Sequence, residues 1–310
     1  MEPNSFYHKF GERVNGSQLA ADYAALRALL RRYPLFASSR LIGPSITQPD
    51  KKSKIKFLNQ FLKASGYKSV DAITWHQYYV NGRTASLDQF LNSTILDALA
   101  VEMRTAQQRT RHYTHQKHFP IWMGETASAF GGGAPGLSDT YVAGFMWLDK
   151  LGMGAVNGID LIVRQSFYNG HYALINEQSL PNPDYWLTLL YKRLVGPGVL
   201  AVSATPRNSN VRIYAHCDNR RITVFAMNLK ADDVRLTFAD YGGPVDVYEY
   251  APMSGNLTDA LITINGRAPS FDDRSVRLRL KPVKSQQPVL LKGFRVIFVV
   301  LPLNDVKCAL

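Results

Sequence analysis

The stretch Pro120-Ile-Trp-Met-Gly-Glu-Thr-Ala-Ser-Ala-Phe-Gly-Gly-Gly133 joins a short apolar run to a carboxylate and then to a glycine-rich loop. A strand of a (β/α)8 barrel delivers an acidic side chain to the active-site face of that fold in this way. A second carboxylate, Glu2, stands in the segment Met1-Glu-Pro-Asn-Ser-Phe6. Two carboxylates that flank one sugar ring are the minimum equipment for cleaving a glycosidic bond. We therefore take Glu125 and Glu2 as the candidate catalytic pair.

Residues 1–196 alternate strand-like and helix-like segments, which is typical of a parallel sheet with right-handed helical crossovers. Apolar runs predict strands at 40–46, 72–79, 120–126 and 159–167. Amphipathic spacing predicts helices at 51–64 and 92–111, and three more that begin at the N-caps Ser17, Ser138 and Asp184. A complete (β/α)8 barrel takes about 250 residues. We therefore expect 1–196, with about four strand–helix units, to be part of a barrel catalytic domain.

The pattern changes after Gly196-Pro-Gly198. Short runs rich in β-branched and aromatic residues then predict strands at 211–215, 221–229, 234–238, 245–250, 261–264, 275–281 and 295–301. In 275–281 apolar residues alternate with Arg277, Arg279 and Lys281, as in a strand with one buried and one solvated face. The expected fold class is α/β plus all-β: a partial (β/α)8 TIM barrel followed by an antiparallel β-sandwich domain over 197–310.

The composition limits the classes of partner. The chain has 310 residues, 46% of them hydrophobic, and a formal net charge of +12. This excess favours a polyanionic partner, although a solvated basic surface explains it equally well. We find no nucleic-acid-binding motif and no apolar run near the ~20 residues of a membrane span, so we expect neither nucleic acid nor a transmembrane segment.

Cysteines, sequons and histidines give weaker signals. Cys217 and Cys308 form a disulfide or remain two buried thiols. Sequons at Asn15, Asn92 and Asn256 suit a secreted or lysosomal glycoprotein, although three sequons also arise by chance. The three histidines that lie close together have no carboxylate or cysteine partner nearby, so we expect no metal and no cofactor; they are His112, His115 and His118.

A set of longer segments carries a family pattern. The segments are Glu2-Pro-Asn-Ser-Phe6, Asn15-Gly-Ser-Gln-Leu19, Thr74-Trp-His-Gln-Tyr-Tyr79, Asn81-Gly-Arg-Thr84, Gly124-Glu-Thr-Ala-Ser128, Gly131-Gly-Gly-Ala-Pro135, Gly144-Phe-Met-Trp-Leu-Asp-Lys-Leu-Gly152, Pro183-Asp-Tyr-Trp186 and His216-Cys217. Over essentially its whole length the sequence resembles glycoside hydrolase family 79. The resemblance implies a (β/α)8 barrel with a β-sandwich, and retaining endo-β-glucuronidase action on heparan sulfate or heparin.

The resemblance also implies catalytic roles. Glu125 is the expected nucleophile, and Glu2 the general acid/base, for which we expect a raised pKa. A retaining enzyme holds its two carboxyl groups about 5–5.5 Å apart. His76 and Tyr78 lie two residues apart on one strand, so both point to one face and are expected to orient Glu125 as catalytic support.

Substrate contacts follow from the same resemblance. Arg83 is expected to bind a sulfate or carboxylate, and an ordinary surface arginine is the alternative. Phe130, Gly131, Gly132 and Tyr172 match substrate-contacting positions, with Phe130 in the place of a common tyrosine. A basic segment resembles a heparin-binding one, with a solvated helix face as the alternative; its candidate residues are Gln48, Lys51, Lys52, Lys54 and Lys56.

The family pattern further implies the Cys217–Cys308 disulfide and a secreted or lysosomal protein of the extracellular matrix. Two departures stand out. Met1 takes the place of the asparagine that precedes the acid/base in the family, and four barrel strands should precede Glu2. The resemblance therefore implies that 1–196 is the C-terminal half of the barrel domain. We expect an N-terminally truncated chain, without its signal peptide, that a missing segment or subunit completes and that is inactive alone. The alternatives are a non-catalytic heparan-sulfate-binding module and a β-glucuronidase acting on other glycans.

Overall fold

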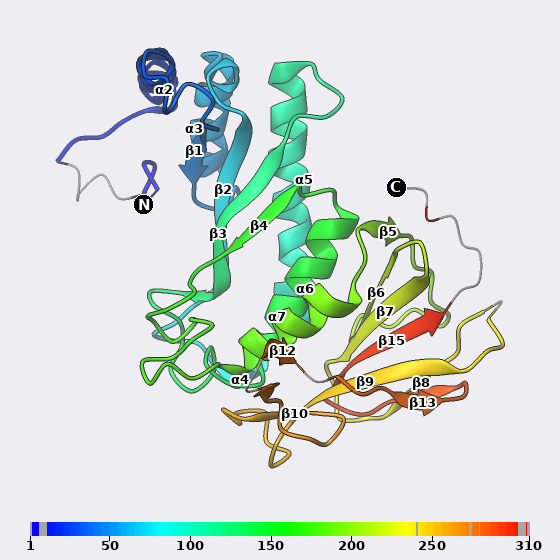
Figure 1. Ribbon diagram of the computed structural model, residues 1–310. Helices are drawn as coiled ribbons and strands as arrows, with labels where there is room; N and C mark the ends of the chain where they lie inside the picture. Colours follow the sequence, from blue (N-terminus) through cyan, green and yellow to red (C-terminus); the bar gives the residue numbers. More distant parts are fainter. Residues whose placement is uncertain are drawn as a thin grey trace. The chain divides into compact units, whose positions relative to one another are not determined.

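The computed structural model describes residues 2–5, 11–239, 241–272, 275–278, 280–302 and 308, with the backbone alone over 271–278 (Figure 1). Its contacts divide the chain into two compact units. The first unit comprises Met1–Tyr78, Asp97–Ala127 and Met153–Gln165. The second unit comprises Tyr79–Leu96, Ser128–Gly152 and Ser166–Leu310. The domain boundary at residue 196 stays a prediction.

A four-stranded sheet confirms the predicted alternation of strands and helices. The spatial order of its strands is the order of the sequence: β1 (Ile42–Ile46), β2 (Ala72–Asn81), β3 (Ile121–Phe130) and β4 (Leu161–Arg164). β1 runs parallel to β2 and β3 runs parallel to β4. The helices between them are α3 (Lys52–Lys63), the 3-10 turn η1 (Gly66–Lys68), the short α4 (Leu87–Phe90), α5 (Ser93–Thr114) and α6 (Ala143–Val156).

Burial explains why these segments form these elements. Nearly every residue of β2 is buried, as expected of a parallel strand covered on both faces. On α3 the buried residues Phe57, Leu58, Phe61 and Leu62 form one apolar stripe, and the lysines lie off it. The spacing of apolar residues in the sequence therefore predicted the strands and helices of this sheet.

Helix starts were predicted less well. The helix α2 (Gly16–Arg31) is capped by Asn15, whose side chain accepts a hydrogen bond from the Gln18 amide, so Ser17 is not the cap. The helix α6 (Ala143–Val156) begins after Ser138. The buried Ser138 hydroxyl instead accepts a hydrogen bond from the Ala134 amide, and it lies 2.8 Å from the Ser128 hydroxyl.

The predicted cap Asp184 is also wrong. The helix α7 (Pro183–Leu194) has Asn182 at its N-cap position, and Asp184 lies in its first turn. Proline is favoured at the first helical position because its fixed φ suits the helix and its missing N–H costs nothing there. Pro183 therefore sets the start of α7, one residue before the predicted cap.

The second unit contains a seven-stranded antiparallel sheet with the order β10-β9-β15-β7-β6-β5, in which β13 also pairs with β9. Its strands are β5 (Gly198–Leu200), β6 (Val211–Cys217), β7 (Arg221–Asn228), β9 (Val245–Pro252), β10 (Ile262–Ile264), β13 (Val283–Ser285) and β15 (Val296–Pro302). Two smaller pairs join β11 (Phe271–Asp272) with β12 (Ser275–Leu278), and β14 (Val289–Leu291) with β8 (Val234–Leu236).

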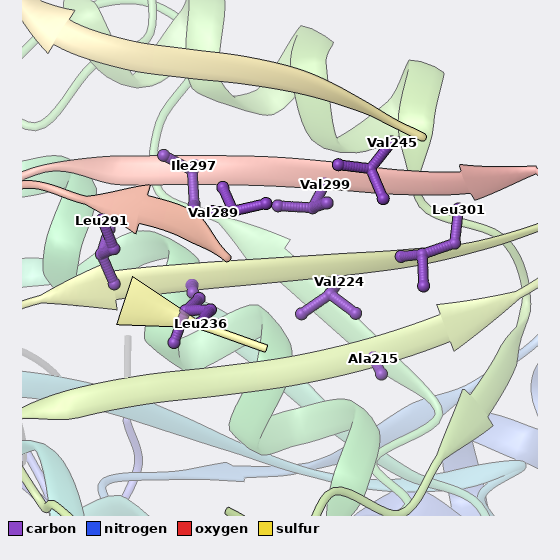
Figure 2. Packing of buried hydrophobic residues seen from close by; sticks show 10 residues of the cluster. Ala215, Val224, Leu236, Val245, Val289, Leu291, Ile297, Val299 and Leu301 are labelled. Atoms are coloured by element: carbon purple, nitrogen blue, oxygen red, sulfur yellow. The ribbon is translucent and has the colours of Figure 1, made fainter. Parts of the chain in front are cut away.

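One hydrophobic cluster forms the core of this unit (Figure 2). It joins residues of the large sheet, such as Val224 and Val299, to Leu236 on β8 and Leu291 on β14. The predicted antiparallel strands are thus confirmed, whereas their assembly into a β-sandwich stays a prediction. The predicted alternation around Arg277 and Arg279 lies outside the described side chains.

The predicted disulfide is present. Cys217 at the end of β6 bonds to Cys308, with 5.9 Å between their Cα atoms and a sequence separation of 91. Both cysteines are buried. In the chain-entropy model, closing a loop of this length stabilises the fold by about 4–5 kcal/mol. None of the described helices combines the length and the apolar character that a bilayer crossing requires.

Candidate active site

Two carboxylates and an imidazole meet in the first unit. His76 Nδ1 lies 3.0 Å from Glu2 Oε1 and 3.6 Å from Glu125 Oε2. One atom from each side chain, a carboxylate oxygen or an imidazole nitrogen, lies within 4.8 Å of the other two. Glu2 and His76 are buried, whereas the Glu125 side chain keeps 29% of its surface exposed. The sequence therefore brings the two predicted catalytic glutamates together from positions far apart in the chain.

Strand β2 supplies two of the groups around Glu125. His76 and Tyr78 lie on one face of β2 because successive side chains of a strand alternate between faces. The Tyr78 hydroxyl donates a hydrogen bond to Glu125 Oε1 at 2.6 Å. The expected contact between this tyrosine and this carboxylate is therefore present.

Glu125 itself sits at an irregularity of β3. Met123 pairs with Ile162 and Thr126 with Arg164, so three steps along β3 match two along β4. Such a bulge re-aims a side chain and is frequent beside active sites. The predicted strand over 120–126 is too short at its C-terminal end, because β3 runs on to Phe130 and ends where Gly131 takes a positive φ of 84°.

A close approach between β2 and β3 holds this bulge in place. A Cβ atom on Gly124 would overlap the Thr74 hydroxyl, so the backbone there requires glycine. The Thr126 hydroxyl donates a hydrogen bond to the Gln77 carbonyl of β2. Both contacts fix the residues that flank Glu125.

The electrostatics of Glu2 differ from the expectation. Burial is the largest single influence and raises the pKa of its carboxyl, but the hydrogen bond and charge of His76, a backbone hydrogen bond and the charge of the amino terminus together lower that pKa below its usual value. The predicted raised pKa is therefore wrong. The physical reason is that several interactions favour the ionised carboxylate, of which the His76 hydrogen bond at 3.0 Å is the largest, and together they outweigh burial.

Asn4 holds the segment that carries Glu2. Its side-chain amide donates to the Thr47 hydroxyl at 3.0 Å, and its carbonyl oxygen accepts from the Thr47 amide at 3.2 Å. Thr47 follows directly after β1. The sequence did not predict these two hydrogen bonds, because nothing in the residues around Asn4 indicates a partner 43 residues away.

The predicted substrate residues of the second unit come from three segments. Backbone hydrogen bonds join these segments. The amide of Gly82, next to Arg83, donates to the Phe130 carbonyl at 2.9 Å, and the amide of His171, next to Tyr172, donates to the Gly132 carbonyl at 2.7 Å. Gly131 and Gly132 have positive φ values of 84° and 96°. Arg83 and Phe130 are exposed, and Tyr172 is half-buried.

The lysines of the basic segment differ in their surroundings. Lys51, Lys52 and Lys56 are exposed, whereas Lys54 pairs with Asp50 at 2.9 Å. Gln48 donates to the Tyr78 carbonyl at 3.3 Å, which places it beside β2. Only part of the predicted cation cluster is therefore free to meet an anion.

Other predictions concern the surface. The three sequon asparagines, Asn15, Asn92 and Asn256, are all exposed. Within the described ranges, the three histidines around His115 belong to no group of metal-ligating side chains, and the one such group is Glu2, His76 and Glu125. The hydrogen bond between His76 and Glu2 suits an acid–base pair as well as a metal site. The absence of a metal therefore stays a prediction.

Comparison with known proteins identifies the family. The family model "Glycosyl hydrolase family 79, N-terminal domain" matches residues 7–152. Heparanase of Rattus norvegicus is 41% identical over 285 residues, which cover 88% of this chain and 52% of that protein. The chain is a heparanase-like protein of glycoside hydrolase family 79.

A second relative of this heparanase-like chain carries a different name. "Inactive heparanase-2" of Homo sapiens is 37% identical over 335 residues, which cover 99% of this chain and 55% of that protein. The chain therefore spans about half the length of the curated relatives it matches.

The solved structures extend the likeness to the fold. The 4-O-α-L-rhamnosyl-β-D-glucuronidase of Fusarium oxysporum superposes with a TM-score of 0.67 at 17% identity, covering 97% of this chain and 68% of that one. At this identity the likeness concerns the fold alone. The structural neighbours of the heparanase-like chain are glycosidases with a TIM-barrel fold.

Proposed function

We propose that this heparanase-like chain supplies both catalytic carboxylates of a retaining endo-β-glucuronidase that hydrolyses heparan sulfate. The observation that carries the proposal is the placement of Glu2 and Glu125, with one oxygen of each within 4.8 Å. Retaining glycosidases hold their carboxyl groups about 5–5.5 Å apart, and inverting ones about 6.5–9.5 Å apart. The shorter spacing leaves no room for a water molecule between the second carboxylate and the anomeric carbon, and so favours a covalent intermediate.

Glu125 suits the role of nucleophile. The Tyr78 hydroxyl donates to it at 2.6 Å, which fixes the orientation of the carboxylate. Its partial exposure leaves an oxygen accessible to the anomeric carbon. In the proposed first step, that oxygen forms a bond to the anomeric carbon while the glycosidic bond breaks.

Glu2 suits the role of acid and base when it is considered together with His76. The general acid needs a proton at the moment when the leaving oxygen departs. The Glu2 carboxyl lies 3.0 Å from His76 Nδ1, so we assign this proton to Glu2 with His76 as its hydrogen-bonding partner. Because the pKa of Glu2 lies below its usual value, its protonated form increases only as pH falls, and turnover is therefore expected to be greatest at acidic pH.

The remaining expectations are part of the same proposal. Arg83, Phe130, Gly131, Gly132 and Tyr172 contact the substrate, and the exposed lysines of the basic segment bind its sulfates. The disulfide and the exposed sequons suit a secreted or lysosomal glycoprotein of the extracellular matrix. The C-terminal strands from residue 197 form a β-sandwich. Since the described residues supply four sheet strands, a preceding segment or a second subunit provides the rest of the barrel.

The test uses the full-length protein that contains this chain. Incubation with a fluorinated glucuronide that traps the glycosyl-enzyme, followed by peptide mass spectrometry, should locate the label on Glu125. Glu125→Gln should abolish depolymerisation of heparan sulfate, while Glu177→Gln, at an exposed position, should leave it intact. Turnover that survives Glu125→Gln, or a label on another residue, would contradict the assignment.

A second candidate function is a heparan-sulfate-binding module without turnover. The similarity to the relative named inactive heparanase-2 favours it, as does the lowered pKa of Glu2. Heparin binding by the full-length protein with no cleavage of heparan sulfate would support this alternative. Cleavage of another glucuronide polymer in place of heparan sulfate would instead indicate a β-glucuronidase of different specificity.

A further inference from the structure

A histidine–aspartate pair lies in the second unit, outside the catalytic cluster around His76. His171 Nδ1 lies 3.0 Å from Asp139 Oδ2. Asp139 belongs to the turn that joins residues 131–133 (the glycine loop) to α6, and His171 directly precedes Tyr172. The pair therefore joins two segments that carry predicted substrate contacts.

The glycine loop depends on other segments for its shape. Gly131, Gly132 and Gly133 all have positive φ values, of 84°, 96° and 88°. Glycine adopts such values without steric cost, but it also has the largest conformational freedom to lose. A Cβ atom added to Gly131 or Gly132 would meet nothing within 4 Å, so these two residues face open space and gain no packing there. Contacts made by other segments must therefore hold the loop.

His171 supplies such contacts through both its backbone and its side chain. Its amide donates to the Gly132 carbonyl at 2.7 Å. A Cβ atom on Gly133 would lie 2.6 Å from the Tyr172 nitrogen and 3.0 Å from the His171 Cβ, so the two backbones are in direct contact. The imidazole extends the link to Asp139, on the turn that follows the loop. One residue thus ties the loop, that turn and Tyr172 together.

The carboxylate of Asp139 depends on this histidine. Its side chain keeps 28% of its surface exposed, but its second oxygen, Oδ1, is buried. Over the part of the chain that the structure describes, Oδ1 has no hydrogen-bond partner, and His171 is the one ion-pair partner of the carboxylate. Buried polar atoms are nearly always hydrogen-bonded, so loss of the histidine would leave a partly buried carboxylate unpaired. The pair is therefore expected to hold the turn more firmly than two exposed side chains would.

We propose that His171 is a positioning residue whose pair with Asp139 fixes the glycine loop and Tyr172 as one surface that receives a sugar of the substrate. An imidazole donates from Nδ1 in its protonated form and in one neutral tautomer, so the link does not require a charged histidine. That the pair fixes the loop is independent of any substrate, whereas its effect on substrate binding rests on the proposed function. Two separate measurements therefore test the two parts.

Amide hydrogen exchange of the full-length protein tests the loop without a substrate. The amides of His171 and Ala134 are both hydrogen-bonded in this region. In Asp139→Ala both should exchange about tenfold faster than in the parent protein, because the loop opens more often. His118→Ala removes a second histidine–aspartate pair, 3.3 Å from Asp160 in the first unit, and should leave both amides unchanged. Unaltered exchange of both amides in Asp139→Ala would overturn the proposal.

Steady-state kinetics of the full-length protein tests the effect on the substrate. His171→Ala should raise KM for heparan sulfate about tenfold and change kcat little, because a misplaced loop weakens the binding of substrate and transition state alike. His171→Asn should keep the parent KM, because its Nδ2 is attached to Cγ as the imidazole Nδ1 is and donates to Asp139 in its place. The double variant His171→Ala/Asp139→Ala should raise KM no further than His171→Ala, because both changes break the same contact.

The outcomes separate this proposal from the proposed function. Faster exchange in Asp139→Ala with an unchanged KM in His171→Ala would show a pair that serves only the fold, and would overturn the positioning role. An equal rise of KM in His171→Asn and His171→Ala would overturn the part played by the hydrogen bond. If the parent protein cleaves no heparan sulfate, the proposed function fails, and the Kd of a heparan sulfate oligosaccharide replaces KM in the same comparison. A parent protein that neither cleaves nor binds this polymer would overturn the role in substrate binding.

Discussion

At the residue scale, the chemistry of this site depends on one imidazole. His76 contacts both glutamates, and its hydrogen bond to Glu2 is the largest of the interactions that lower the pKa of that carboxyl against the effect of burial. The residue types were predictable from the sequence, but the sign of the pKa shift was not. It depends on the 3.0 Å distance between two side chains 74 positions apart, which apolar spacing and family likeness do not give.

Replacement of His76 tests this balance. In His76→Gln the charge of the imidazole no longer lowers the pKa of Glu2, so that pKa should rise. The high-pH limb of kcat/KM, which reports loss of the acid's proton, should move to higher pH, although the rate itself falls. A pH–rate profile of the full-length protein measures it. His118→Gln, which alters an exposed contact with Asp160, should leave the limb in place. A limb that moves to lower pH in His76→Gln would contradict the argument.

Tyr78 offers a second prediction at this scale. Tyr78→Phe removes the hydroxyl that donates to Glu125 at 2.6 Å and leaves the ring. A hydrogen bond to a charged group contributes about 1.5–3 kcal/mol, so kcat/KM on heparan sulfate should fall about 10- to 100-fold. Tyr168→Phe, at an exposed tyrosine, should change kcat/KM little. An unaltered rate in Tyr78→Phe would show that the hydroxyl does not support the nucleophile.

At the scale of elements, apolar runs predicted β1 to β4 and most C-terminal strands, whereas boundaries followed local backbone geometry. β3 passes its predicted end at Thr126 and stops before Gly131, where the backbone takes a positive φ. Strands as short as β5 and β14 offer too few residues for an alternation to be recognised.

The approach of β2 to β3 can be tested with Gly124→Ala. The new methyl group would overlap the buried Thr74 hydroxyl, and overpacking of this kind costs about 1–3 kcal/mol. Urea denaturation should show the loss in the free energy of unfolding. Adding Thr74→Ala should recover part of it, because that change removes the clashing oxygen. Gly242→Ala, where the added atom meets nothing within 4 Å, is the matched control. Equal stability of Gly124→Ala and the parent would refute the close approach.

At the scale of the whole molecule, the cross-link between Cys217 and Cys308 is the strongest single constraint. Removing it in Cys217→Ser/Cys308→Ser should lower the free energy of unfolding by about 2–5 kcal/mol, because the unfolded chain regains the entropy of an open loop. The midpoint of urea denaturation measures this loss. Reductant should lower the midpoint of the parent and leave that of the double variant unchanged. If reductant lowered both midpoints equally, the stabilisation would not come from this bond.

The same cross-link has a practical outcome for anyone who handles the protein. A protease that cuts the backbone once between Cys217 and Cys308 leaves two pieces that are still joined by sulfur. Nicked material would therefore migrate as one band on a gel run without reductant and separate into two bands after reduction. A purity check without a reducing agent would therefore miss a backbone cut in this region.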